Sequence, residues 1–151
     1  MNFDPSLPTS YEYIHYTGEN LDTIDLSRTY IQTAERLASY MPNGLWLSIA
    51  GINDWEKYCF KNNYNLLNLR YEFQVKLKPR AKILILQNTD AFENFEETYA
   101  YRWEAIIKDH QGLALPRVMP QMRNRGLWND AWCCTSACIW DLQAVEKVEK
   151  L

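Results

Sequence analysis

Residues 44–59 read GLWLSIAGINDWEKYC, in which an apolar strand pattern passes through a short turn into a helical pattern. Residues 44–49 are rich in aliphatic and aromatic side chains, which is typical of a β-strand. Asn53 and Asp54 are both suitable N-caps, because their side-chain oxygens accept hydrogen bonds from the first turn of a helix. The sequence therefore predicts a strand at 44–49 and a helix over 55–63.

The predicted strand has two chemically different faces. By the two-residue period of a strand, Trp46 and Ser48 share one face, while Leu45 and Leu47 share the other. Aromatic residues make up 14% of the chain, and their rings form both cores and flat walls for planar ligands. This strand therefore places an aromatic and a polar side chain among apolar neighbours.

The patterns on either side of this segment predict a single α+β domain. Alternating or continuous apolar character predicts further strands at 12–17, 71–77, 82–87, 113–116, 136–142 and 144–151. Helical spacing predicts two more helices, over 27–40 and over 89–110 with a break near Glu97. We expect the apolar run at 82–87 in the centre of the sheet, and Gly112 as the C-cap of the preceding helix. Because strands outnumber helices, a mixed or antiparallel sheet is favoured.

Composition limits the classes of partner. The 151 residues carry a formal net charge of −3, whereas general nucleic-acid binders usually have a basic surplus. Arg117, Arg123 and Arg125 form a local basic stretch, a candidate surface for a diphosphate, a nucleic acid or an acidic protein face. No apolar run has the length of a membrane span, and no N-terminal signal pattern is present. We therefore expect a cytoplasmic protein, or one delivered into a host cell without a classical signal peptide.

The four cysteines do not match a zinc pattern. Cys133 and Cys134 are adjacent, unlike a C-x-x-C pair, and no H-x-x-x-H motif accompanies them. We expect Cys59, Cys133, Cys134 and Cys138 to be reduced, partly buried thiols, and we expect no metal.

Two titratable side chains lie inside predicted apolar strands. His15 is in EYIHYT, residues 12–17, and Asp141 is in CIWDL, residues 138–142. A carboxylate within a strand is costly unless it is paired, hydrogen-bonded or solvated by a cleft. The structural alternatives are that Asp141 lies at the end of its strand and caps a turn, and that His15 is a satisfied core or surface residue.

The strand-and-helix segment resembles the poly(ADP-ribose) polymerase fold of the ADP-ribosyltransferase superfamily. GLWLS followed by DWEKYC is similar to the family's glycine–aliphatic–aromatic–aromatic strand and its following helix, which ends in Asn-Tyr-Cys. The family signature is a histidine, a tyrosine and a glutamate, each on its own strand. On this resemblance His15 stands at the histidine, Trp46 at the tyrosine and Asp141 at the glutamate. The chain is thus similar to divergent, small bacterial and phage mono-ADP-ribosyltransferases.

The resemblance implies a split mixed or antiparallel sheet with flanking helices, and NAD as the substrate. Tyr58 matches the tyrosine that stacks on nicotinamide, with Trp55 as the competitor for that role. Trp46 or Tyr16 would form the opposite wall of the slot. The backbone N–H and C=O of Tyr16 match the family's clamp on the carboxamide, and His15 would bond the adenosine-side ribose.

The resemblance also assigns the chemistry to the late acidic position. Asp141 would accept a hydrogen bond from the 2′-hydroxyl of the reacting ribose and stabilise the developing cation, with Ser48 supporting the carboxylate. Asp is one methylene shorter than the family's Glu. Ile139 stands where arginine-specific enzymes have Glu or Gln, so an arginine acceptor is not supported.

The implied activity is mono-ADP-ribosyl transfer, a glycosyltransferase reaction. NAD is cleaved at the nicotinamide–ribose bond, and ADP-ribose passes to a macromolecular acceptor, which we expect to be a protein, as for an effector or toxin. A nucleic-acid acceptor is less favoured by the net charge, and no membrane partner is expected. Two alternatives stay open: an NAD glycohydrolase, and a catalytically degenerate module that binds NAD or ADP-ribose.

Overall fold

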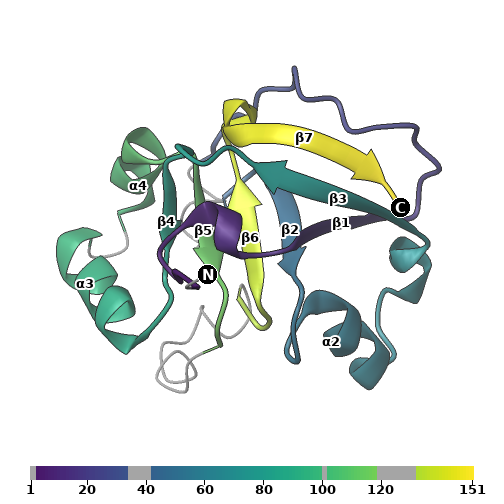
Figure 1. Ribbon diagram of the computed structural model, residues 1–151, viewed down its shortest axis with the longest axis horizontal. Coiled ribbons are helices and arrows are strands. Elements are labelled where there is room, and N and C mark those ends of the chain that lie inside the picture. The colour runs from purple at the N-terminus through teal and green to yellow at the C-terminus, as the bar shows by residue number, and fades with distance from the viewer. Residues whose placement is uncertain (1–2, 34–41, 100–101, 119–131) are drawn as a thin grey trace.

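The computed structural model describes residues 3–33, 42–99, 102–118 and 132–151, which fold around one seven-stranded sheet (Figure 1). The order across the sheet is β4-β5-β6-β2-β1-β3-β7. β4 pairs with β5 in parallel and the other neighbouring pairs are antiparallel, so the sheet is mixed and the predicted α+β class is confirmed. The strands are β1 (Tyr13–Thr17), β2 (Leu45–Ile49), β3 (Tyr71–Leu77), β4 (Ile83–Ile85), β5 (Gly112–Leu115), β6 (Ser136–Ile139) and β7 (Val145–Lys150).

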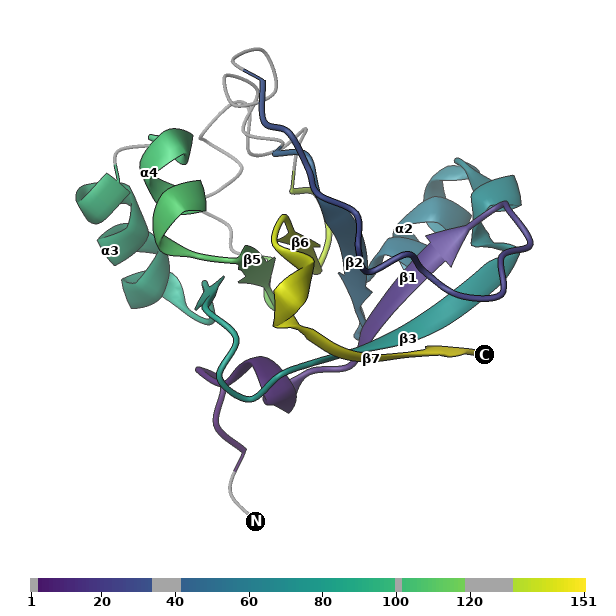
Figure 2. The same ribbon diagram turned by 90° about the horizontal axis from the view of Figure 1, so that it is seen from above.

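Helices flank the sheet at two separate places. They are α2 (Trp55–Asn62), α3 (Thr89–Tyr99) and α4 (Trp103–Asp109), with short 3₁₀ turns η1 (Pro8–Ser10), η2 (Leu66–Leu69) and η4 (Leu142–Ala144). α3 and α4 lie together beside β4 and β5, whereas α2 lies on the other side of the molecule, following β2 (Figures 1 and 2). In the described part of the chain, no helix has both the length and the apolar character needed to cross a membrane.

The two faces of the sheet bury separate apolar clusters. One cluster includes Tyr13 of β1 and Leu47 of β2, and it extends across the sheet. The other cluster lies under the helices, where Phe95 of α3 and Trp103 of α4 pack with Leu113 of β5. Each fully buried side chain of this size contributes about 1.5–3 kcal/mol, so burial on both faces holds the strands in place.

The predicted helix over 27–40 is wrong for residues 27–33, which are not helical, while residues 34–40 lie outside the described part of the chain. Long-range hydrogen bonds explain the difference. Asn43 Nδ2 donates to the Ile31 carbonyl at 2.8 Å, and Gln32 bonds the backbone N–H and C=O of Asn43 at 2.8 and 2.6 Å. These tertiary bonds override the helical spacing of the segment.

The prediction that residues 82–87 lie at the centre of the sheet is also wrong, because β4 is an edge strand. Ile83 packs against the cluster that contains Tyr13, and Leu84 packs against the cluster that contains Phe95. The continuous apolar run therefore reflects coverage of both faces, not neighbours on both edges.

Gly112 begins β5 and does not cap α4, whose C-cap is His110. A Cβ at Gly112 would lie 2.8 Å from the Cys138 carbonyl oxygen and 2.6 Å from Ile139 Cδ1. Glycine is therefore required by the close approach of β6, not by a helix terminus.

Two further boundaries differ from the predictions. The helix break expected near Glu97 falls after Tyr99, where α3 ends. The strand predicted at 136–142 ends at Ile139, so Asp141 does not lie within a strand. The alternative, that Asp141 follows the strand and caps a turn, is confirmed, because Asp141 is the N-cap of η4.

Candidate functional site

The segments that carry the three signature residues belong to neighbouring strands. β6, β2 and β1 lie side by side in that order. His15 is on β1 and Trp46 is on β2, while Asp141 follows the end of β6. Residues far apart in the sequence are thus brought onto one continuous part of the sheet.

β1 and β2 pair only where they first meet. Tyr13 pairs with Ile49 and Ile14 pairs with Ser48, and the register between the two strands continues no further. Figure 2 shows β1 and β2 running apart from this point. We call the diverging parts of the two strands, residues 15–17 of β1 and 45–47 of β2, the β1–β2 fork.

His15 stands at the start of the fork. Its Nδ1 lies 2.9 Å from the Trp46 carbonyl oxygen, and because a carbonyl only accepts, Nδ1 carries the proton and donates. Nε2 is then an acceptor in the neutral imidazole. Burial lowers the pKa of His15 and outweighs the opposing effect of the Trp46 carbonyl, so the ring is neutral at pH 7.

The backbone of Tyr16 points into the fork. The Ala50 N–H donates to the Glu12 carbonyl at 3.0 Å, so the peptide groups of Glu12 face β2, and those of every second residue after it do the same. Tyr16 is four residues further on, where pairing with β2 has stopped. If the pairing continued, the Tyr16 N–H would donate to the Trp46 carbonyl oxygen. That oxygen instead accepts from the imidazole N–H of His15. The Tyr16 N–H and C=O therefore face the fork as a donor and acceptor pair.

The predicted nucleotide-binding side chains are divided between the two faces of the sheet. Ile14 pairs with Ser48, so by the two-residue period Tyr16 and Trp46 project to the same face as Ser48. His15 projects to the other face, where it pairs with Phe73 of β3. The structure therefore gathers Tyr16, Trp46 and Ser48 on one side of the fork and His15 on the other.

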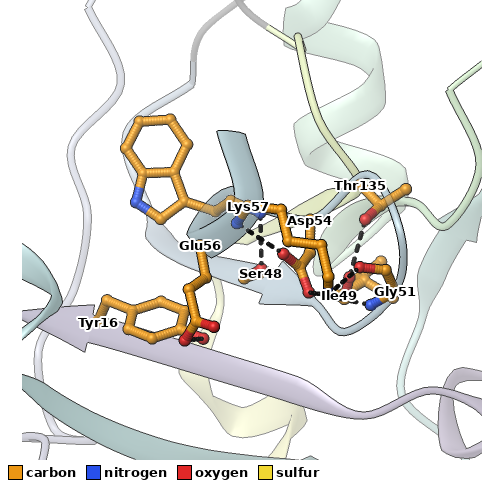
Figure 3. Close-up of polar contacts among 9 residues, drawn as sticks. Tyr16, Ser48, Ile49, Gly51, Asp54, Glu56, Lys57 and Thr135 are labelled. Carbon is orange, nitrogen blue, oxygen red and sulfur yellow. Dashed lines mark hydrogen bonds and ion pairs between the residues drawn. The ribbon is translucent and has the colours of Figure 1, made fainter. Parts of the chain in front are cut away.

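The N-terminus of α2 is fastened to β2 on the face of Ser48 (Figure 3). The Trp55 N–H donates to Ser48 Oγ at 3.1 Å, and Ser48 is buried. Asp54 is the N-cap, as predicted, and accepts from the Lys57 and Gly51 N–H groups at 3.0 and 3.1 Å. Burial alone would raise the pKa of Asp54, but these N–H groups and the Lys57 ammonium hold it below its ordinary value.

Thr135, next to the start of β6, holds the turn between β2 and α2 (Figure 3). Its Oγ1 donates to the Ile49 carbonyl at 2.8 Å, and its backbone N–H donates to the Asn53 carbonyl at 2.9 Å. The position of α2 over the sheet is thus fixed from two strands.

The candidate aromatic rings form two separate groups. Trp55 and Tyr58 are stacked, with ring centroids 5.6 Å apart and planes at 14°, and Tyr64 meets Trp55 edge-on at 6.1 Å. Trp46 instead contacts the buried Trp132, at 4.9 Å between centroids. Tyr58 and Trp55 therefore present a shared stack on α2, while Trp46 has Trp132 on one side.

Tyr16 makes a contact that the sequence analysis missed. Its hydroxyl donates to Glu56 Oε2 at 3.2 Å, and both side chains are half-buried (Figure 3). In the sequence, Glu56 has the ordinary position of an acid in the first turn of a helix. Its neighbour on β1 is 40 residues away, so no local pattern indicates the contact.

Asp141 follows the end of β6 at which Ile139 pairs with Leu45 of β2, beside the open part of the fork. At about 3.3 Å per residue, Ser136, which pairs with Ser48, and Ile139 are about 10 Å apart along the strand, so Asp141 lies far from Ser48. The Asp141 carboxylate accepts from the Gln143 N–H at 3.0 Å and from Gln111 Nε2 at 3.1 Å. Neither hydrogen bond joins it to the residues gathered at the fork.

The remaining predicted features are the cysteines and the basic stretch. The four cysteines are free thiols, and the described part of the chain contains no cluster of three metal-ligating side chains. Arg117 is exposed, while Arg123 and Arg125 lie outside the described residues.

Comparison of the chain with protein-family models, with curated proteins and with solved structures finds no match to any of the three.

Proposed function

We propose that this protein binds NAD at the β1–β2 fork and acts as a mono-ADP-ribosyltransferase. The observation that carries the proposal is the pair of Tyr16 peptide groups, which face the fork because His15 occupies the Trp46 carbonyl. A primary amide offers one acceptor and two donors, so one N–H and one C=O on the same strand edge are its natural complement. The nicotinamide carboxamide is such a group.

The surroundings of Tyr16 suit the rest of the dinucleotide. The stacked Trp55 and Tyr58 rings on α2 provide a flat apolar surface for the nicotinamide ring. His15 Nε2 is an acceptor on the opposite face of the fork, where it would bond a ribose hydroxyl of a dinucleotide that passes between the two strands, while Nδ1 is held by Trp46. NAD serves as the substrate, and its ADP-ribose goes to a macromolecular acceptor, which we take to be a protein.

A second candidate function is NAD or ADP-ribose binding without cleavage. It is favoured by the contacts of Asp141, whose carboxylate is engaged by Gln111 and Gln143, neither of which belongs to the fork. Asp141 as the catalytic acid stays a prediction, which measurement of nicotinamide release by an Asp141 variant would test.

The experiment that tests the proposal has two parts. Calorimetric titration with NAD measures binding, and incubation with NAD labelled in the adenylate, together with cell lysate, measures transfer. Label on a macromolecule together with released nicotinamide supports the transferase. Nicotinamide release with only free ADP-ribose indicates a glycohydrolase, and binding without release indicates the binding module. Absence of NAD binding would contradict all three.

The carboxamide clamp has its own test. The nicotinic acid analogue of NAD replaces the amide NH₂ by a carboxylate oxygen, so it cannot donate to the Tyr16 carbonyl. Loss of one buried hydrogen bond costs about 1–3 kcal/mol, so we expect the analogue to bind about tenfold more weakly or worse. Equal binding of NAD and the analogue would remove Tyr16 from the proposal.

A further inference from the structure

Cleavage of NAD at the nicotinamide ribose needs a negative group near C1′, because the sugar develops positive charge as the bond breaks. The Asp141 carboxylate accepts hydrogen bonds from Gln111 and Gln143, and neither of these residues belongs to the fork. Glu56 is the acid that hydrogen-bonds a fork residue directly, through the Tyr16 hydroxyl at 3.2 Å. The structure therefore offers a different carboxylate from the one that the sequence indicates.

The position of Glu56 is fixed by its neighbours on both sides. The preceding residue, Trp55, donates its N–H to the buried Ser48, and Asp54 caps the helix (Figure 3). Tyr16 binds the carboxylate from β1. Glu56 thus bridges the two strands of the fork: its helix is fastened to β2, and its side chain is bonded from β1.

The charge of Glu56 is not neutralised by its surroundings. Lys57, the nearest cation in the sequence, pairs with Asp54 at 3.2 Å, and no lysine or arginine of the described residues pairs with Glu56. Burial raises the pKa of Tyr16, and the charge of Glu56 raises it further, so the phenol stays a neutral donor. A half-buried carboxylate that accepts from a hydroxyl and pairs with no cation of the described residues can attract a positively charged ligand.

We propose that Glu56 is the catalytic carboxylate of the fork, stabilising the ribosyl cation of NAD. This inference rests on the proposed function. In the reaction, the C1′–N bond breaks and its electron pair leaves with nicotinamide, which becomes neutral. An acceptor hydroxyl or amine then attacks C1′ and gives up its proton to the Glu56 carboxylate, which passes it to solvent. The sum is NAD plus acceptor giving ADP-ribosyl acceptor, nicotinamide and one proton.

The matched variants are Glu56→Gln and Glu104→Gln, each replacing a carboxylate in the first turn of a helix by an amide of the same shape; Glu104 is exposed on α4. In Glu56→Gln the amide oxygen of the new side chain still accepts from Tyr16, so α2 keeps its place. We expect Glu56→Gln to lower the rate constant of nicotinamide release about 100- to 1000-fold, as for other lost electrostatic contacts to a developing charge. We expect Glu104→Gln to retain the rate of the wild type. Calorimetry should show the same NAD affinity in all three proteins.

A split between kcat and KM separates catalysis from structure. We expect Glu56→Gln to lower kcat for nicotinamide release and to leave the KM for NAD unchanged, whereas a merely structural role of Glu56 would change KM as well.

Each contrary outcome has a distinct meaning. Full activity in Glu56→Gln, or an equal loss of activity in Glu104→Gln, overturns the role of Glu56 and leaves the proposed function standing. NAD binding by the wild type without nicotinamide release overturns the catalytic role and leaves a binding site. Absence of NAD binding by the wild type overturns both proposals.

Discussion

His15 donates its Nδ1–H to the carbonyl oxygen of Trp46 at 2.9 Å, at the point where β1 and β2 stop pairing. A side-chain donor has taken the place of a backbone N–H, so strand pairing ends while the carbonyl keeps a hydrogen-bond partner. The imidazole thereby acts as a spacer between two strands of one sheet. This accounts for a histidine in an otherwise core-forming strand.

The pH dependence of stability follows from the lowered pKa of His15. The unfolded chain takes up a proton near the ordinary value of about 6.5, while the folded protein resists protonation until the pH is lower. The stabilising contribution is therefore complete above about pH 6.5 and is lost as the pH falls towards the folded value. We expect His15→Asn, which keeps a donor for Trp46 but does not titrate, to lose less stability than the wild type on acidification. Urea unfolding at about pH 7, 6 and 5 measures this.

His110 provides the control for this prediction. Its pKa is also lowered by burial, and its Nε2 lies 2.9 Å from the Tyr99 hydroxyl, so His110→Gln should remove a separate share of the slope. Identical pH slopes in the wild type and His15→Asn would contradict a neutral, buried His15.

The hydrogen bond between Ser48 and the Trp55 N–H should be visible in hydrogen exchange. Ser48→Ala leaves the first turn of α2 without this acceptor, and we expect a loss of about 1–3 kcal/mol in the free energy of unfolding. The Trp55 amide should exchange faster. Ser136→Ala is the control, because Ser136 pairs with Ser48 but its hydroxyl bonds the Cys134 carbonyl. Faster exchange at Trp55 in both variants would argue against a specific anchor.

Gly112 should be intolerant of a side chain. A Cβ there would meet the Cys138 carbonyl at 2.8 Å, so Gly112→Ala must shift β6 away from β5, and we expect a cost of about 1–3 kcal/mol. At Gly51 the nearest atom is 4.0 Å away, so Gly51→Ala should change stability by less than about 0.5 kcal/mol. Thermal and urea unfolding measure both. Similar costs at the two positions would contradict the close approach.

Tyr58 should contribute to NAD affinity through its ring. Tyr58→Ala removes one member of the stack with Trp55, and we expect the Kd for NAD to rise about tenfold, while Tyr58→Phe keeps it. Phe60→Ala is the control on the same helix, because the Phe60 side chain is 64% exposed and makes no part of the stack. Calorimetric titration gives the three constants. A rise in Kd for Phe60→Ala as large as for Tyr58→Ala would point to a general effect on α2.

Local patterns in the sequence were sufficient for much of the fold. Strand periodicity predicted β1, β2 and β3, and Asp54 was identified as a candidate cap of α2. The helix predicted over residues 27–33 is wrong, because this segment bonds Asn43, which lies further along the chain, in place of the hydrogen bonds of a helix. The central position predicted for β4 is wrong, because an apolar run indicates that both faces of a strand are covered and does not indicate whether both of its edges are paired.

In the candidate site, too, contacts between positions far apart in the sequence could not be predicted from local patterns. The nucleotide-binding residues proposed for β1, β2 and α2 belong to elements that neighbour one another in sequence, and most of these residues lie on one face of the fork. Asp141 was tied to the fork only by the order of residues along the chain. Its local bond to Gln143 and its contact with Gln111 determine where it lies. The Tyr16–Glu56 contact joins positions 40 residues apart and could be found only from coordinates.

β7 closes the sheet on one side, and its composition has a consequence for solubility. Among the described strands it pairs with β3 alone, so it forms an edge of the sheet, where a strand of another molecule could pair. The alternating sequence VEKVEK sets ammonium and carboxylate groups along that edge, and Lys147 forms an ion pair with Glu149. Docking a second strand there would require these charges to shed water, which discourages fibre-like stacking of copies.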